Sequence, residues 1–304
     1  MDLPTDLALA DLHRHLDGSL RPSTLAELAQ RAGLSVPVDL AFSAGMGLEA
    51  ALSRFAFTLS LLQEPGAVRR IAAEICEDAA AEGVTTLEIR FAPQLHRGAP
   101  IEAILDAALE GAGGRAGLIL CGLYGEPPEV LRALVEAGAR RPGVVGVDLA
   151  GGPSGGHAFR LADYAPVYRR AEELGLGRTV HAAEGRPAEE IRVAVEALRA
   201  QRIGHGTTLL ADPEVVDLVI ERGVVIEACP TSNVHTGIFP SVAAHPLPAW
   251  LDAGVRACIS TDNTLLSAVD APEEHRRAFA IPGMDERRLR AAVAFGHQGA
   301  FALR

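Results

Sequence analysis

The 304-residue sequence contains no lysine, and all 28 residues of the lysine and arginine class are arginines. This absence excludes a Schiff-base enzyme, a P-loop nucleoside triphosphatase and any site that depends on a lysine nucleophile or base. Asparagine is almost as scarce, because it occurs only at Asn233 and Asn263. We expect an asparagine that is kept in such a chain to serve chemistry.

Cysteine is also rare, and the four cysteines lie far apart without a C-x-x-C pair: Cys76, Cys121, Cys229 and Cys258. A structural zinc knuckle is therefore excluded, and a chain of this size does not need a disulfide framework. We expect these thiols to lie in the core.

Long apolar runs and basic blocks are missing as well. No run approaches the roughly 20 apolar residues that a transmembrane helix needs. The first ten residues carry Asp2 and Asp6 in place of the basic residues of a secretory signal. The net charge of −11 at pH 7 disfavours duplex nucleic acid and anionic membranes as partners. The sequence therefore predicts a cytoplasmic protein that binds small molecules, and it leaves the oligomeric state open.

Short apolar or β-branched runs recur between longer stretches of helical periodicity, which is typical of βα units. The predicted strands lie at 9–15, 85–91, 116–123, 144–149, 179–182, 202–205, 224–229 and 255–260. The predicted helices that connect and follow them lie at 66–83, 99–112, 127–140, 159–175, 187–200, 212–222, 245–253 and 285–303. Eight strands that alternate with helices favour a closed (β/α)8 barrel of the TIM type over an open sheet.

One connection is longer than the others. The stretch from about 22 to 65, after the first strand, shows helical periodicity at 23–32 and 47–62, and we expect this insertion to lie over the barrel mouth. No internal repeat or linker interrupts the chain. The sequence therefore predicts a single domain over residues 1–304.

Polar residues gather at the predicted C-terminal ends of the strands, which open on one face of such a barrel. His13 and His15 end the first strand, and their spacing of two directs both imidazoles to the same side. His181 ends the fifth strand, and Asp262 follows the eighth. Taken singly, an H-x-H pair is more often filler and an aspartate after a strand is more often a cap. Together, three histidines and an aspartate suit a divalent ion such as zinc, with a position left for water.

Two further residues near these strand ends can take part in catalysis. Glu184 follows His181 by three positions, and burial can keep its carboxyl group protonated for donation to a substrate nitrogen; the alternative is an ordinary solvated glutamate. His205 lies between Gly204 and Gly206, which allow the backbone to approach a ligand closely, and its imidazole can orient or deprotonate a bound water.

Six motifs, in this order and across about 250 residues, resemble those of the adenosine deaminase family in the amidohydrolase superfamily. They are His13-Arg-His15-Leu-Asp17-Gly18, Val147-Asp148-Leu149-Ala150-Gly151, His181-Ala-Ala-Glu184, Arg202-Ile-Gly-His205-Gly206, Cys229-Pro-Thr-Ser-Asn233 and Ser260-Thr-Asp262-Asn263. The resemblance implies one zinc ion per chain, bound by His13, His15, His181 and Asp262. It implies that Glu184, His205 and Asp262 are catalytic, with Glu184 protonating purine N1 and His205 assisting the attacking water. It also implies that Asp17 holds the sugar, that the Gly151 backbone meets N3, and that Asn263 meets N7.

The sequence departs from this family at two positions. Asn263 stands where many adenosine deaminases have a second aspartate, and its amide can donate to N7 without unusual protonation. Ala182 replaces the more usual glycine after His181. The absence of lysine also removes the carboxylated lysine that bridges two metals in many superfamily members. The H-x-E and P-C-x-x-C spacings of cytidine-type deaminases are not present.

The predicted function is zinc-dependent hydrolysis of adenosine or 2′-deoxyadenosine to inosine or 2′-deoxyinosine and ammonia, with water as the second substrate. One alternative is a 5′-substituted adenine nucleoside such as aminodeoxyfutalosine. Free adenine is another, although its deaminases usually have glutamate where Asp17 stands. Two alternatives come from other functional classes. The first is a catalytically inactive binding protein, and the second is a metal-dependent hydrolase of amides or phosphoesters.

Overall fold

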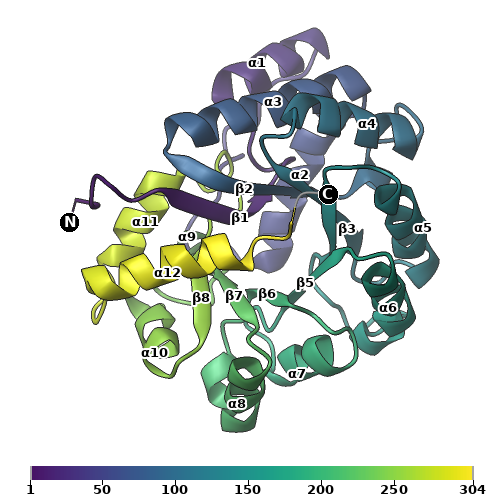
Figure 1. Cartoon of the computed structure of the whole chain (residues 1–304). Coiled ribbons are helices and arrows are strands. Elements are labelled where there is room, and N and C mark those ends of the chain that lie inside the picture. Colours follow the sequence, from purple (N-terminus) through teal and green to yellow (C-terminus); the bar gives the residue numbers. More distant parts are fainter. Residues whose placement is uncertain (1, 303–304) are drawn as a thin grey trace.

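The computed structural model describes residues 2–302, in which eight parallel strands surround a central axis (Figure 1). Each strand pairs with the next one in the sequence, so that the order in the sheet runs from β1 to β8. The strands are β1 (Leu9–His15), β2 (Val84–Phe91), β3 (Gly117–Leu123), β4 (Val144–Ala150), β5 (Gly177–Ala182), β6 (Arg202–His205), β7 (Val225–Ala228) and β8 (Arg256–Ile259). All eight predicted strands are present, and their ends agree with the prediction to within two residues.

Strand β1 closes the barrel against the segment that follows β8. The backbone N–H of Asp262 donates to the carbonyl oxygen of His13 (2.7 Å), and the N–H of His15 donates to the carbonyl oxygen of Asp262 (2.8 Å). Arg14 and Asp262 accordingly form a parallel bridge. The predicted (β/α)8 barrel of the TIM type is therefore confirmed.

Twelve α-helices occur in the described residues, and most of them form a ring outside the strands (Figure 1). They are α1 (Pro22–Arg31), α2 (Leu48–Leu61), α3 (Pro65–Ala81), α4 (Ile101–Ala112), α5 (Pro128–Ala139), α6 (Ala165–Glu173), α7 (Glu189–Glu196), α8 (Pro213–Glu221), α9 (Pro230–His235), α10 (Leu247–Asp252), α11 (Ala271–Phe279) and α12 (Glu286–Gly299). Eight of them have a proline at the first or second position. Proline suits this place because its fixed φ matches the helix and its missing N–H would be unpaired there anyway.

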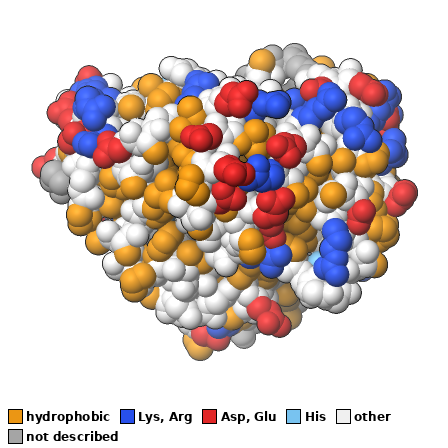
Figure 2. Space-filling model, turned by 90° about the horizontal axis from the view of Figure 1, so that it is seen from below, with side chains coloured by type: hydrophobic (Ala, Val, Ile, Leu, Met, Phe, Trp, Pro, Cys, Tyr) orange, Lys and Arg blue, Asp and Glu red, His pale blue; other side chains and the backbone are white. Residues whose placement is uncertain are grey.

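The main apolar core lies between the strands and the ring of helices. Buried leucines, valines and isoleucines of both layers form one continuous cluster, which includes Ile71 of α3, Leu134 of α5 and Ile203 of β6. All four cysteines are buried and free, as predicted. Among the described residues, none of the helices combines the length and the apolar character needed to cross a bilayer. On the face shown in Figure 2, acidic and basic side chains are interspersed rather than gathered by sign.

The structure differs from the prediction in the loops after β7 and β8 and at several helix ends. Helices α9 and α11 were not predicted, although Asp270 caps α11 by accepting from the N–H of Glu273 at 2.7 Å. The helix predicted at 159–175 begins as a 3-10 turn and becomes α-helical only at Ala165, and the one predicted at 187–200 spans only Glu189–Glu196. The last helix ends at Gly299, and residue 303 of its predicted range lies outside the described residues.

The long connection between β1 and β2 contains α1 and α2. Figure 1 shows α2 on the far side of the barrel, behind the strands, where it faces their C-terminal ends. Leu48, Leu52 and Phe55 of α2 line a cavity together with residues at those strand ends, including His15 and His181. The insertion therefore places an apolar helix over the polar end of the barrel.

The opposite end of the barrel is covered by the ring of Phe301, which lies against Gly146 of β4 and Gly177 of β5. Glycine is required opposite this ring, because a Cβ atom at Gly177 would lie 2.2 Å from Phe301 Cγ. The guanidinium carbon of Arg202 lies 3.8 Å from the ring centroid, and the N–H of Phe301 donates to Glu88 Oε1 at 2.6 Å. Phe301 therefore connects the end of the chain to charged residues inside the barrel.

Replacing the half-buried Phe301 with alanine should lower the free energy of unfolding by about 2 kcal/mol, because apolar contact and the interaction with Arg202 are both lost. Urea unfolding followed by circular dichroism measures this change. Leu210→Ala, at a leucine that is 42% exposed, is the control and should change it by less than about 0.5 kcal/mol. Equal effects of the two substitutions would contradict a closing role for Phe301.

Candidate active site

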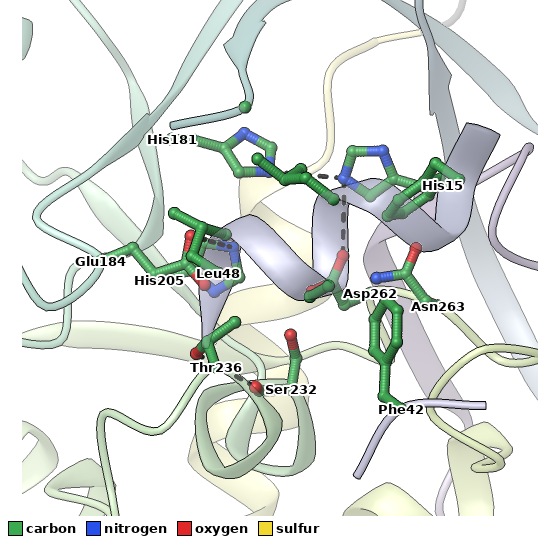
Figure 3. Close-up of a pocket in the computed structure, with 14 residues that line it drawn as sticks. His15, Phe42, Leu48, His181, Glu184, His205, Ser232, Thr236, Asp262 and Asn263 are labelled. Atoms are coloured by element: carbon green, nitrogen blue, oxygen red, sulfur yellow. Dashed lines mark hydrogen bonds and ion pairs between the residues drawn. The ribbon is translucent and has the colours of Figure 1, made fainter. Parts of the chain in front are cut away.

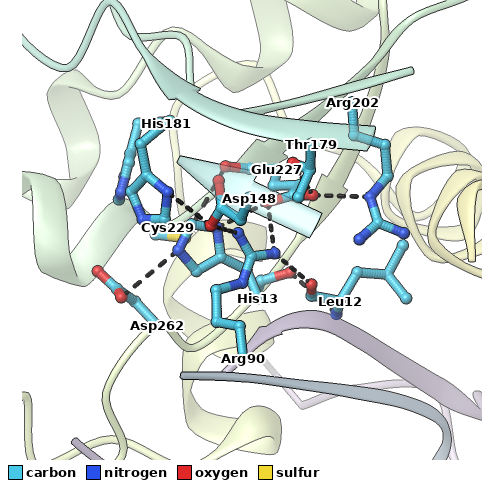
Figure 4. A network of polar contacts seen from close by, with 12 residues as sticks. Leu12, His13, Arg90, Asp148, Thr179, His181, Arg202, Glu227, Cys229 and Asp262 are labelled. Atoms are coloured by element: carbon cyan, nitrogen blue, oxygen red, sulfur yellow. Dashed lines mark hydrogen bonds and ion pairs between the residues drawn. The ribbon is translucent and has the colours of Figure 1, made fainter. Parts of the chain in front are cut away.

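The predicted metal ligands meet at the C-terminal ends of the strands. Figure 3 shows His15, His181 and Asp262, and Figure 4 shows His13 beside His181 and Asp262. The ligand nitrogens of His13, His15 and His181 lie within 4.8 Å of one another. Asp262 Oδ1 lies 3.6 Å from His13 Nε2 and 3.5 Å from His15 Nε2. The structure thus brings together four residues that span about 250 positions of the sequence.

The protonation of these imidazoles suits metal binding. His13 Nε2 is buried and has no hydrogen-bond partner among residues 2–302. Burial lowers the pKa of both His13 and His15 well below its usual value, so that these rings are neutral, whereas the carboxylate of Asp148 raises the pKa of His181. Neutral imidazole nitrogens together with one carboxylate form a donor set of the kind that binds zinc while leaving a position open for water. The residues present therefore fit a divalent ion such as zinc.

Two buried carboxylates orient two of the imidazoles (Figure 4). His13 Nδ1 lies 2.7 Å from Glu227 Oε2, and His181 Nδ1 lies 2.9 Å from Asp148 Oδ2. A carboxylate that holds Nδ1 of a histidine fixes the tautomer and directs Nε2 toward a metal. Glu227 and Asp148 therefore orient the rings of His13 and His181 from the side opposite Nε2.

Arg90 of β2 binds both of these carboxylates. Its Nη1 donates to Asp148 Oδ2 at 2.9 Å and its Nη2 to Glu227 Oε2 at 2.8 Å, so the oxygens that face His181 and His13 also face one guanidinium. Burial opposes ionisation of Glu227, but Arg90 and Arg202 lower its pKa to about 2. The three charges stay ionised because each is paired inside the barrel.

Backbone conformation at the strand ends is unusual. Ala183 (φ 55°), His205 (φ 67°) and Asp262 (φ 61°) follow or end β5, β6 and β8, and all three are left-handed without being glycine. Such conformations are costly and persist where the surrounding structure enforces them, often at functional sites. The barrel therefore holds the backbone of these three residues in costly conformations.

Glu184 and His205 face the same cavity as the predicted ligands (Figure 3). Burial raises the pKa of Glu184 to about 7, so that a large share of its carboxyl groups is protonated near neutral pH. His205 Nε2 lies 3.8 Å from Glu184 Oε2, and its Nδ1 lies 3.1 Å from the side-chain nitrogen of Asn233. A carboxyl group that can be protonated and an imidazole thus lie beside the predicted metal ligands.

The predicted substrate-binding residues lie at the same end of the barrel. A Cβ atom at Gly18 would lie 2.0 Å from Asn263 Oδ1, so that the glycine makes room for the amide oxygen. Figure 3 shows the amide nitrogen of Asn263 directed toward the cavity. Asp17 is buried, its Oδ1 has no hydrogen-bond partner among the described residues, and burial raises its pKa to about 7. Gly151 lines the cavity in a left-handed conformation (φ 81°).

Two adjoining cavities occupy this end of the barrel. The catalytic cavity, of about 50 Å³, contains Glu184, His205, Asp262 and Asn263 in its wall. An outer chamber of about 320 Å³ contains Asp17 in its wall, and the two spaces share His15, Leu52, Phe55 and Gly151. The catalytic cavity has room for a few water molecules only, so it must widen to take a larger ligand.

Several residues of the site were missed in the sequence. Arg90 and Glu227 are charged residues within buried parts of strands, and this position is the signal that could have found them. Asn233 was quoted only as part of a motif, without a role. Tyr124, whose hydroxyl donates to the carbonyl oxygen of His181 at 2.6 Å, carries no signal that is visible in the sequence.

Arg90→Met should weaken zinc binding by about 10- to 100-fold, because Asp148 and Glu227 lose the cation that fixes them behind His181 and His13. Competition with a chelator measures the affinity. Arg178→Met is a matched control: Arg178 is also buried in a strand, and it donates to the carbonyl oxygens of Leu176 and Arg199 instead. An equal loss of zinc affinity in both variants would show that only general stability is affected.

Comparison with known proteins agrees with this geometry. The family model described as adenosine deaminase matches residues 8–303. The adenosine deaminase of Erwinia tasmaniensis is 32% identical, with 98% of this chain and 95% of the relative covered. That of Vibrio parahaemolyticus is 33% identical, with 97% and 94% covered.

Solved structures show the same fold. The adenine deaminase of Arthrobacter aurescens has a TM-score of 0.88 at 25% identity, covering 97% of this chain and 94% of its own. An amidohydrolase of Burkholderia ambifaria with bound zinc has a TM-score of 0.85 at 26% identity, covering 97% and 86%. Arabidopsis ADAL complexed with GMP has a TM-score of 0.85 at 25% identity, covering 97% and 93%. The chain therefore belongs to the adenosine deaminase family and is a purine-deaminating hydrolase that acts on C–N bonds.

Proposed function

We propose that the chain catalyses zinc-dependent hydrolytic deamination of a 6-aminopurine nucleoside, with adenosine and 2′-deoxyadenosine as leading substrates. The products are inosine or 2′-deoxyinosine and ammonia. The observation that carries the proposal is the buried, protonatable Glu184 in the same cavity as His15, His181 and Asp262. The identity of about one third to two adenosine deaminases supports this choice of substrate.

We assign one zinc ion per chain to His13, His15, His181 and Asp262. If held by these residues, a zinc ion would lower the pKa of a water molecule to about 7. Glu227 and Asp148 keep Nε2 of His13 and His181 directed toward the ion. The absence of lysine from the sequence supports a mononuclear site, because no carboxylated lysine can bridge two ions.

The protein side chains donate the proton and position the purine base. Glu184 donates its proton to N1 of the purine. This makes C6 more electrophilic, so that water can add to it. His205, held by Asn233, orients the attacking water opposite Glu184. Asn263 donates its amide N–H to N7, and the backbone of Gly151 meets N3.

Asp17 distinguishes a nucleoside from a free base. Its buried carboxyl group has an unpartnered oxygen, which suits a hydroxyl donor of the ribose. Free adenine would leave this oxygen without a partner, so we place adenine behind the nucleosides even though a structural neighbour is an adenine deaminase.

The purified protein should contain about one zinc ion per chain. His13→Ala and Asp262→Ala should each lose most of the metal together with the activity, since each removes one of four ligands. Elemental analysis and the ultraviolet change that accompanies adenosine deamination measure the two quantities. Two ions per chain, or full activity after chelation, would refute the mononuclear site.

Glu184→Gln should lower kcat by about 100-fold or more, because the amide keeps the shape of the side chain but cannot act as a proton donor of the same strength. The KM for adenosine should change much less. Glu189→Gln is the control, since Glu189 is an exposed residue of α7 that pairs with Arg192 at 3.1 Å. Near-normal turnover in Glu184→Gln would mean that another group delivers the proton.

A further inference from the structure

Glu184 lies beyond the end of the strand that carries it. The last pair of the ladder between β5 and β6 joins Ala182 to His205, two residues before Glu184. One backbone hydrogen bond continues past this pair, from the N–H of Gly206 to the carbonyl oxygen of Ala182 at 3.1 Å. The position of the Glu184 carboxyl group therefore depends on contacts outside the ladder.

Thr207 supplies such contacts through one hydroxyl group. Its Oγ1 donates to the carbonyl oxygen of Ala183 at 2.8 Å and accepts from the N–H of Gly185 at 2.8 Å. Ala183 and Gly185 stand on either side of Glu184, so a single oxygen holds the backbone before and after this carboxylic acid. Thr207 is buried, which strengthens both hydrogen bonds because water competes less for them.

The backbone of Ala183 has a conformation that requires support. Its φ of 55° lies in the left-handed region, which is unfavourable for a residue with a Cβ atom. The N–H of Ala183 donates to Glu190 Oε2 at 3.0 Å, and Arg186 Nε donates to the other oxygen of Glu190 at 2.6 Å. Both polar backbone groups of Ala183 are thus bonded to side chains, one from α7 and the other that of Thr207. These bonds hold the conformation from which Glu184 lines the catalytic cavity.

The same hydroxyl joins Glu184 to the segment that carries His205. Thr207 follows His205 by two positions, after two consecutive left-handed residues, His205 (φ 67°) and Gly206 (φ 57°). His205 Nε2 lies 3.8 Å from Glu184 Oε2. Because Thr207 bonds to the residues on both sides of Glu184, a shift of one loop against the other breaks these bonds and changes that distance.

We propose that Thr207 is a positioning residue, whose hydroxyl holds Glu184 and His205 at the separation that protonation of N1 and attack of water at C6 require. The inference rests on the proposed function, because it assigns the proton of N1 to Glu184. Thr207 is not among the described residues that line either cavity, so it acts through Glu184 rather than on the substrate. A displacement of a reacting group by about 1 Å can lower a rate by about 100-fold.

Thr207→Val replaces the hydroxyl with a methyl group of similar size and removes both hydrogen bonds. On the zinc-loaded enzyme, kcat for adenosine should fall by about 10-fold or more. The Ki of 1-deazaadenosine, which has a C–H group in place of N1, should change by less than about 2-fold because this analogue takes no proton from Glu184. Thr207→Ser keeps the hydroxyl and should restore kcat to within about 3-fold of the wild-type value. An unchanged kcat in Thr207→Val, or equal losses in the valine and serine variants, would overturn the inference.

A double-mutant cycle with Glu184→Gln tests whether Thr207 acts through the acid. Once Glu184 has lost its proton, Thr207→Val should lower kcat by less than about 2-fold further. Losses that multiply in the double variant would overturn the inference alone, because Glu184→Gln by itself would still be impaired. Near-normal turnover of Glu184→Gln would instead refute the proposed proton donor, and the inference with it.

Thr24→Val is the matched control for the loss of a buried hydroxyl. Thr24 of α1 is also buried, and its Oγ1 both donates to Glu74 Oε2 at 2.7 Å and accepts from Arg70 Nη2 at 3.3 Å. This variant should keep the wild-type kcat, and thermal melting compares its stability with that of Thr207→Val. An equal fall of kcat in the two variants would assign the effect of Thr207→Val to stability and overturn the inference.

Discussion

One guanidinium inside the barrel determines the geometry of the site. Arg90 holds the same two carboxylate oxygens that face His13 and His181, and it also donates to the carbonyl oxygen of Leu12 at 2.6 Å. Removing one charge from such a buried set leaves the others unpaired, which is costly in a medium of low polarity. The positions of the His13 and His181 imidazoles therefore depend on Arg90, which shares the ionisation of Glu227 with Arg202.

The interior of this barrel is polar, unlike that of most TIM barrels. TIM barrels commonly fill their interior with branched apolar side chains, whereas this one contains Arg90, Arg202, Glu88 and Glu227 paired with one another. Apolar packing is displaced to the layer between strands and helices, where one continuous cluster forms. Glycine makes the inner layer feasible, because a Cβ atom at Gly204 would lie only 3.0 Å from His13 Cε1.

The sequence predicts the strands and the grouping of polar residues at their ends, but not the buried ion pairs inside the barrel. Strand positions could be predicted because apolar runs and helical periodicity are local properties. The proximity of the predicted ligands could be predicted because the C-terminal ends of the strands share one face. The pairing of Arg90 with Asp148 and Glu227 joins three strands and depends on distances that no local pattern encodes. Helix α11 was missed although its cap is local, because it is short and most of its residues are charged or polar. The outer chamber arises from α2 and two loops, whose relative placement is a matter of tertiary packing.

The closure of the barrel through Asp262 has a consequence for the order in which the molecule is made. The backbone of Asp262 joins to that of His13 and His15, which precede it by about 250 residues. During synthesis the three histidines leave the ribosome before this aspartate, and contacts of such long sequence separation form late in folding. The pairing that closes the barrel also brings the last of the four proposed ligands to the other three. A chain that stops short of β8 would carry only three of these proposed ligands, on a barrel that is not closed.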